Sequence, residues 1–133
     1  MERFISDYEM SIDLSKAKTI ILAAAPADLR KGIDGYASLV QTYLDMDPTD
    51  GSFYLFTNRQ KNKMKGILFD GNNYWLLYKR VSAFSLKWPD SDDREEYYRI
   101  NNSQLTSLMV GLSIIPKTVK LESFSDDPNR ESS

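Results

Sequence analysis

The chain has 133 residues, of which 41% are hydrophobic and 27% are charged, a composition typical of one compact folded domain. It contains neither cysteine nor histidine, which excludes disulfides, thiolate metal sites and histidine-based proton transfer. No apolar run approaches the roughly 18 residues that cross a bilayer. The first residues also lack the basic and apolar regions of an export signal. We therefore expect a cytoplasmic protein without a membrane partner.

The net charge of -2 conceals an uneven distribution of charge along the chain. Residues 1–15 carry one basic and four acidic side chains, residues 16–89 carry eleven and six, and residues 90–133 carry five and nine. Within residues 59–88, seven basic side chains accompany a single acid, Asp70. The middle of the chain is therefore predicted to produce a local positive field even though the whole protein is acidic.

The chain divides by composition into three parts. Residues 1–18 are mixed and polar and are interpreted as an N-terminal extension, whereas residues 116–133 are expected to form a polar, flexible tail. Residues 19–115 are predicted to form a single domain. It opens with a β-branched and apolar run at residues 19–24, which indicates a buried strand. Apolar positions spaced by three and four then predict a helix over residues 33–45.

An antiparallel meander is expected to follow. Its predicted strands are residues 53–57, 64–69, 74–81 and 84–88. The tetrapeptide Asp70-Gly71-Asn72-Asn73 is typical of a tight hairpin turn. Residues 97–100 indicate a further short strand, and Ser103 is expected to cap a helix over residues 103–112. The predicted fold is α+β, an antiparallel β-meander of three to five strands with two helices packed on one face.

Basic residues in several parts of the domain are candidates for binding nucleic acid. Residues 59–65 place four positive charges within seven positions of a predicted turn, an arrangement that suits contacts to phosphate. Arg30-Lys31-Gly32 lies between a strand and a helix, where backbone N–H groups can also hold phosphate. The nucleic-acid-binding candidates are Arg30, Lys31, Arg59, Lys61, Lys63, Lys65, Lys79, Arg80 and Lys87.

Aromatic residues interleave with these cations in the predicted strands. Tyr74, Tyr78 and Trp88 are candidates for an aromatic surface on which bases stack. The alternative interpretation is that the aromatic side chains fill the core and pair across strands. In that case the lysines only solvate one face and protect an edge of the sheet.

Three carboxylates allow a catalytic hypothesis to be stated. Asp28, Asp34 and Asp70 are the set that would have to hold two divalent metal ions about 3.5–4 Å apart in a metal-dependent nuclease. The structural interpretation gives each a local role: Asp28 caps a turn, Asp34 lies in the first turn of a helix, and Asp70 shapes a hairpin. We favour the structural interpretation, with no catalytic residue, no bound metal and no cofactor.

Ten consecutive residues carry a more specific signal: Pro26-Ala27-Asp28-Leu29-Arg30-Lys31-Gly32-Ile33-Asp34-Gly35. This segment resembles the one that opens the core of small accessory proteins, often called TnpB, of the insertion-sequence sixty-six family of bacterial transposons. Further matches follow in the same order within residues 19–112: Asp47-Pro48 with Gly51, Phe56 with Asn58-Arg59, Lys65, Asp70-Gly71, Tyr78-Lys79-Arg80, Trp88-Pro89, and Gln104-Leu105 with Leu108 and Gly111. Two departures are Asn73, where a second glycine is common, and Phe84-Ser85-Leu86, which replaces the usual glycine-basic-phenylalanine.

The resemblance implies a function in transposition. Proteins of that family are encoded beside a separate large transposase and are similar to accessory factors needed for movement of the element. We therefore expect a non-catalytic accessory protein that binds transposon DNA, the large transposase, or both. The alternative is a protein-protein interaction module without direct DNA contact, and a metal-dependent nuclease is a distant third. The oligomeric state is not predicted.

Overall fold

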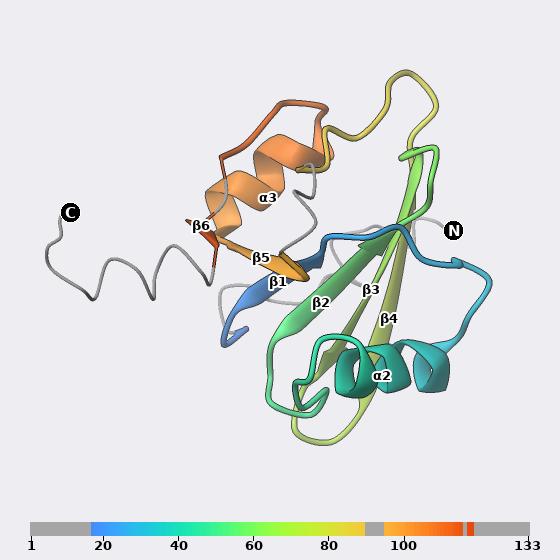
Figure 1. Ribbon diagram of the computed structural model, residues 1–133, viewed down its shortest axis with the longest axis vertical. Coiled ribbons are helices and arrows are strands. Elements are labelled where there is room, and N and C mark those ends of the chain that lie inside the picture. Colours follow the sequence, from blue (N-terminus) through green and yellow to red (C-terminus); the bar gives the residue numbers. More distant parts are fainter. Residues whose placement is uncertain (1–16, 90–94, 116, 119–133) are drawn as a thin grey trace, which may run out of the picture.

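The computed structural model describes residues 17–89, 95–115 and 117–118 (Figure 1). Its elements in chain order are β1 (Ile20–Ala23), α2 (Ile33–Thr42), β2 (Phe53–Thr57), β3 (Lys63–Phe69), β4 (Tyr74–Arg80), β5 (Tyr97–Ile100), α3 (Asn102–Met109) and β6 (Lys117–Thr118). Residues 1–16 of the expected extension and most of the expected tail lie outside the described residues. In the described ranges no helix is long and apolar enough to cross a membrane.

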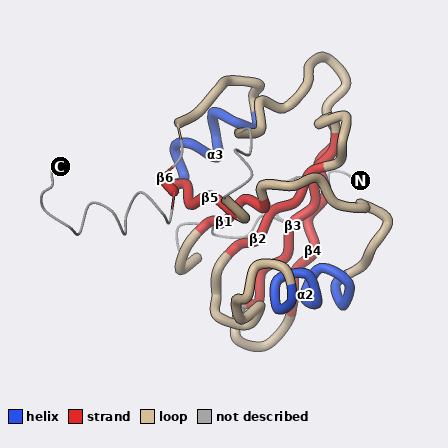
Figure 2. The backbone as a smooth tube through the Cα atoms, viewed as in Figure 1, coloured by secondary structure: helices blue, strands red, loops and turns tan. Residues whose placement is uncertain are grey.

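The six strands form one sheet in the order β4-β3-β2-β1-β5-β6, as the tube in Figure 2 shows. β2, β3 and β4 are the predicted antiparallel meander, and β5 pairs antiparallel with both β1 and β6. β1 pairs parallel with β2, because α2 and its flanking loops return the chain to the same end of the sheet before β2 begins. The α+β class is therefore confirmed, and the sheet is mixed rather than a pure meander.

The two helices cover opposite faces of the sheet. Ile20 and Leu22 of β1 belong to the hydrophobic core cluster under α3, which we call the α3-side core. Ile21 of β1 packs instead in a second cluster with Tyr36 and Val40 of α2, which we call the α2-side core. The prediction that both helices pack on one face is wrong. All the side chains of β1 and β2 are buried, so other parts of the chain must pack against both faces of these central strands.

The predicted strand at residues 84–88 is irregular chain in the structure. Its period-two pattern is real, because Leu86 and Trp88 are both buried in the α3-side core. The backbone N–H of Leu86 donates to the carbonyl oxygen of Lys61 at 2.7 Å, and the indole N–H of Trp88 donates to the carbonyl oxygen of Ala23 at 2.8 Å. Alternating burial thus arises here from an extended segment that is anchored to loop and strand carbonyls without joining the sheet.

Helix α3 begins one residue earlier than expected and has a different cap. Asn101, not Ser103, is the N-cap, and its side chain accepts a hydrogen bond from the backbone N–H of Gln104 at 2.7 Å. The side-chain oxygen of Gln104 accepts in return from the backbone N–H of Asn101 at 2.9 Å. This reciprocal capping box satisfies two backbone donors that the start of a helix would otherwise leave unpaired. The two helices end at Thr42 and Met109, each three residues before the predicted end.

Candidate functional site

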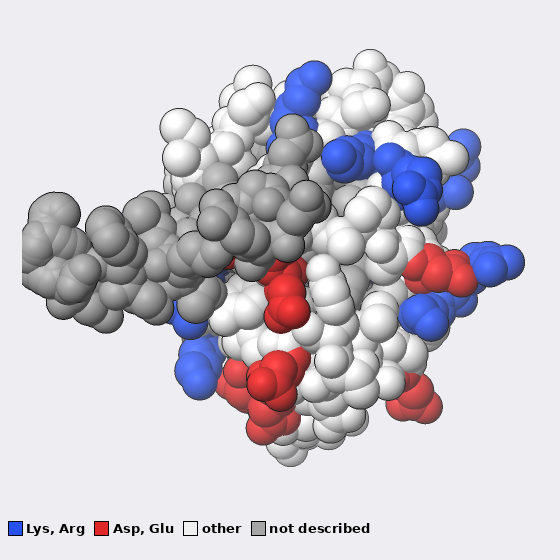
Figure 3. Space-filling view, viewed as in Figure 1, with Lys and Arg blue, Asp and Glu red and all other residues white. Residues whose placement is uncertain are grey.

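Basic and acidic side chains collect at opposite ends of β2, β3 and β4. The β2–β3 turn and the adjoining strand ends carry Arg59, Lys61, Lys63, Lys65, Lys79 and Arg80. The opposite end, where the chain enters β2 and where β3 turns into β4, carries Asp45, Asp47, Asp50 and Asp70. Most of the Lys and Arg side chains on the face drawn in Figure 3 gather at its upper right, and the acidic ones lie mainly lower. The sheet therefore has a positive and a negative end, a charge distribution that orients an approaching anion.

The side chain of Asn58 shapes the basic turn between β2 and β3. Its Oδ1 accepts hydrogen bonds from the backbone N–H groups of Asn62 at 3.1 Å and Lys63 at 3.2 Å. Its Nδ2 donates to Oδ1 of Asn62 at 2.6 Å and to Oε1 of Gln60 at 3.3 Å. Lys61 adopts a left-handed backbone with φ of 59°, which lets the chain reverse direction within the turn. One amide side chain thus holds the backbone of the whole basic turn in place.

Residues 26–31 form a second wall opposite this turn. The backbone N–H of Ala27 donates to the carbonyl oxygen of Thr57 at 2.8 Å, which fastens the segment to the end of β2. The hydroxyl of Tyr36 in α2 donates to the carbonyl oxygen of Asp28 at 3.0 Å. Burial raises the pKa of Tyr36 to about 12, so its hydroxyl keeps the proton that it donates. The wall is therefore anchored to both the sheet and the helix.

Asp28 and Arg30 form an ion pair on this wall. Oδ1 of Asp28 accepts from the backbone N–H of Arg30 at 2.9 Å and from its Nε at 3.0 Å, and Oδ2 accepts from Nη2 at 3.0 Å. These hydrogen bonds lower the pKa of Asp28 to about 2, so its carboxylate is ionised at neutral pH. Both side chains are exposed, so the pair contributes little to stability. It orients the guanidinium of Arg30 and offsets part of its charge.

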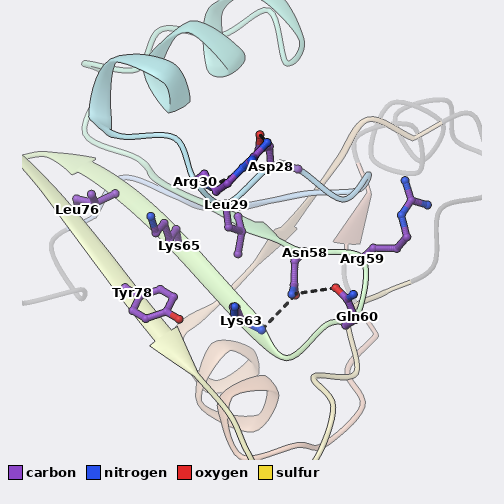
Figure 4. Close-up of a pocket in the computed structure, with 11 residues that line it drawn as sticks. Asp28, Leu29, Arg30, Asn58, Arg59, Gln60, Lys63, Lys65, Leu76 and Tyr78 are labelled. Atoms are coloured by element: carbon purple, nitrogen blue, oxygen red, sulfur yellow. Dashed lines mark hydrogen bonds and ion pairs between the residues drawn. The ribbon is translucent and has the colours of Figure 1, made fainter.

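A groove of about 700 Å³ lies between residues 26–31, the basic turn and the outer strands β3 and β4. Its lining residues are Ala27, Asp28, Leu29, Arg30, Asn58, Arg59, Gln60, Lys63, Lys65, Leu76 and Tyr78. Figure 4 shows Lys63, Lys65 and Tyr78 along the two strands, with Asp28, Leu29 and Arg30 across from them. The ammonium of Lys65 lies 5.7 Å from the centre of the Tyr78 ring, within cation–π distance.

Four of the nine basic candidates line this groove: Arg30, Arg59, Lys63 and Lys65. Figure 4 shows that the Arg59 side chain extends from the turn away from the other labelled residues. The candidates that do not line the groove are Lys31, Lys61, Lys79, Arg80 and Lys87. Arg80 is the register partner of Lys63, which places both side chains on the α2 face of the sheet. Lys79 is opposite Met64, a residue of the α3-side core, and so belongs to the other face.

The three aromatic candidates have different environments. Tyr78 is 54% exposed and lines the groove. Tyr74 is partly buried against the α2-side core, and its ring centre lies 5.0 Å from that of Phe69. Trp88 is only 4% exposed, so its assignment to an aromatic surface is wrong. Its indole fills the α3-side core and binds a carbonyl of β1, which is the core-filling alternative stated for the aromatic residues.

Sequence reasoning did not select Leu29, Asn58 or Leu76, although all three line the groove. Asn58 carried a usable signal, because an asparagine at the start of a polar stretch between two strands is a residue that commonly organises a turn. Leu29 and Leu76 had no sequence pattern that marked them as groove residues. They meet at the groove only because residues 26–31 fold back over the outer strands, and such tertiary placement leaves no local pattern.

Each of the three carboxylates proposed for metal binding has a local structural role. Asp28 accepts from Arg30, and Asp34 lies in the first turn of α2. Asp70 closes the β3–β4 hairpin, accepting from the backbone N–H of Asn73 at 2.8 Å and from the indole of Trp75 at 2.9 Å. No group of three acidic residues able to hold a metal ion occurs within the described part of the chain. Asp28 and Asp70 lie near opposite ends of β3, so they do not form one site.

The fold and the groove define a small α+β protein with a cationic, partly aromatic surface at one end of its sheet. The chain belongs to the IS66 Orf2-like family, since that family, described as "IS66 Orf2 like protein", matches residues 18–118. This family consists of transposition accessory proteins and is generally considered non-catalytic. The resemblance read from the residue motifs is thereby confirmed.

Two curated proteins of Sinorhizobium fredii are similar to this chain. The uncharacterized protein y4hO is 30% identical over 91 residues, which cover 68% of this chain and 77% of that protein. The uncharacterized protein y4jC is 28% identical over 79 residues, covering 59% of this chain and 68% of that protein. No solved structure matches the chain.

Proposed function

We propose that this chain is a non-catalytic accessory factor for transposition of a bacterial insertion sequence, and that it binds the DNA of its element through the groove. The observation that carries the proposal is the charge of the groove. Four cationic side chains and one carboxylate line it, an excess of three positive charges in a protein whose net charge is -2. A local cluster of positive charge on a protein whose net charge is negative favours a polyanionic ligand.

The shape of the groove indicates which part of DNA it would contact. Lys63 and Lys65 are two positions apart in β3 and lie on the same face of the sheet, so their Cα atoms are roughly 6–7 Å apart along the strand. Adjacent phosphates of a DNA strand are spaced at a similar distance, so successive phosphates suit successive lysines. Contacts of this kind give affinity and register without reading base identity. Recognition of the element's ends by sequence would then depend on the transposase.

The test measures duplex DNA binding between about 50 and 200 mM salt. Replacing Lys63 and Lys65 together by glutamine should weaken binding and reduce the salt slope by roughly one to two units, because about 0.9 counterions are released per phosphate contact. Lys18→Gln is the matched control, since Lys18 is an exposed lysine near Asp47 at the acidic end. Absence of DNA binding at low salt, or an equal loss in the control, would refute the proposal.

A protein-interaction module is the second candidate function. Large apolar side chains are exposed after α3, where Val110, Leu112 and Ile115 are well separated from the groove residues in sequence. Exposed apolar residues that cluster on a surface are typical of protein-protein contacts. This function is supported if the chain co-purifies with the large transposase in salt that abolishes DNA binding, and if Leu112→Lys removes the association. Failure to co-purify under those conditions leaves only the DNA proposal.

A further inference from the structure

One edge of the sheet is long and open. β4 is the outermost strand beside β3, and in the described residues no strand pairs with its other side. It has seven residues and no proline, whereas the strand at the opposite edge, β6, has only two residues. An edge of this length exposes a row of unpaired backbone groups that can pair with another strand.

The β3–β4 register determines which backbone groups point outward. At the two ends of this ladder, Asp70 N–H donates to the carbonyl of Asn73 at 3.0 Å and Val81 N–H donates to the carbonyl of Asn62 at 2.8 Å. Hydrogen-bonded and non-hydrogen-bonded pairs alternate between these ends in an antiparallel ladder. The odd-numbered residues of β4 therefore bond to β3. The residues whose N–H and C=O groups point away from β3 are Tyr74, Leu76, Tyr78 and Arg80.

The side chains of this edge are apolar for most of its length. Trp75 is 36% exposed, Leu76 39% and Tyr78 54%. Edge strands of proteins that remain monomeric are commonly short, or are protected by charges or proline along their length. In β4 the two charges, Lys79 and Arg80, are both at the C-terminal end.

We propose that β4 pairs antiparallel with β4 of a second copy of the chain, about a two-fold axis at Leu77. This register pairs all seven residues and uses the outward backbone groups of both strands, because hydrogen-bonded pairs join Tyr74 to the partner's Arg80 and Leu76 to the partner's Tyr78. Trp75 then lies opposite the partner's Lys79, and Leu77 lies opposite its own copy. The contact is isologous, with the same surface used by both subunits.

Charge complementarity selects a second copy as the occupant of this edge. In the two-fold register no cation lies directly opposite a cation, and each one lies opposite an aromatic side chain, an arrangement that suits cation–π contact. Burial raises the pKa of Tyr74, and the nearby carboxylates of Asp47 and Asp34 raise it further. Pairing brings the partner's Arg80 to this acidic end, so the positive end of each sheet meets the negative end of the other.

The pairing also has a consequence for the groove. Directly opposite residues of an antiparallel pair lie on the same face of a sheet. Leu76 and Tyr78, which line the groove, would therefore meet the same residues of the partner on one continuous face. The dimer would carry two cationic grooves side by side, although the proposal of a dimer does not depend on what the grooves bind.

Single cysteines test the register, because the natural chain has none. Leu77→Cys should form an intermolecular disulfide on mild oxidation, since non-hydrogen-bonded partners have Cα atoms about 4.5 Å apart. Trp75→Cys and Lys79→Cys should each fail to cross-link alone, because each lies roughly 13 Å along the strand from its own copy. Mixing these two variants should restore the cross-link. The mixture keeps the test valid if Leu77→Cys fails to fold.

Molecular mass in solution provides the second measurement, made without DNA over a roughly hundredfold range of protein concentration. The natural chain should be a dimer, and Leu76→Lys should raise the dissociation constant of the dimer at least tenfold. Leu112→Lys is the matched control, because Leu112 is 57% exposed and far from β4 in sequence, and this variant should remain dimeric. A monomer at all concentrations, a dimer insensitive to Leu76→Lys, or cross-linking of Leu112→Cys as fast as that of Leu77→Cys would overturn the proposal.

Discussion

The packing around Gly66 makes the sharpest prediction for stability. Gly66 is in β3, and a Cβ at this position would lie 2.5 Å from Cδ2 of Leu55 and 2.6 Å from Cε1 of Phe53. Both of these side chains are fully buried, so neither can move aside without disturbing the α3-side core. Gly66→Ala is therefore expected to cost about 1–3 kcal/mol through overpacking. Reduced entropy of the unfolded chain offsets roughly 0.5–1 kcal/mol of this.

Subtracting the offset from the cost leaves a net loss centred at about 1 kcal/mol, which corresponds to a thermal midpoint lowered by roughly 4–8 °C for a domain of this size. Thermal and urea unfolding measure it, and the urea slope should stay unchanged. Gly32→Ser is the control, because nothing lies within 4 Å of a Cβ at Gly32 and its extended backbone suits an N-cap serine. We expect this control to be as stable as the natural chain or slightly more so. A Gly66→Ala protein with an unchanged or raised midpoint would show that the core is looser than described.

Three further changes probe features described above. Trp88→Phe removes a buried hydrogen bond to β1 and should lower the free energy of unfolding by about 1–3 kcal/mol, measured in urea. Asn101→Ala removes the α3 capping box and should cost about 0.5–2 kcal/mol by the same measurement. Asp28 has a folded pKa of about 2, below its ordinary value of 3.8. The stability that its carboxylate contributes to the folded chain is therefore fully present above about pH 4 and is lost as the pH falls toward about 2. Asp28→Asn should change acid unfolding only slightly, because the pair is exposed, and should strengthen DNA binding by removing the one carboxylate of the groove; weaker DNA binding would contradict this expectation.

Local signals predicted the elements well, and tertiary relations were predicted less well. The Asp70-Gly71 turn and the apolar runs beside it defined β2, β3 and β4 to within one residue at each end. The parallel pairing of β1 with β2, and the helices on opposite faces, depend on which segments meet after folding. Trp88 illustrates the same limit, since the alternation that predicted a strand belongs to an extended segment packed on the core.

The candidate groove was foreseen in part for the same physical reason. Its turn from Asn58 to Lys65 is contiguous in sequence, so the density of charge there was visible without a structure. Its opposite wall comes from residues 26–31, which the Tyr36 hydroxyl and the end of β2 hold in place across many intervening residues. Contacts between such distant segments follow no spacing rule, and hence the pairing of the two walls required coordinates.

The central position of β1 constrains how the chain acquires its fold. This strand is among the first described residues of the sequence, yet its hydrogen-bonding partners are β2 on one side and β5, some 75 positions later, on the other. During synthesis, a chain that extends only as far as β4 has no strand to pair with the second side of β1. That side is paired only after β5 has been synthesised. We expect β1 to β5 to assemble in one all-or-none step, with the amide hydrogens of Ile21 and Leu22 exchanging with solvent only on global opening.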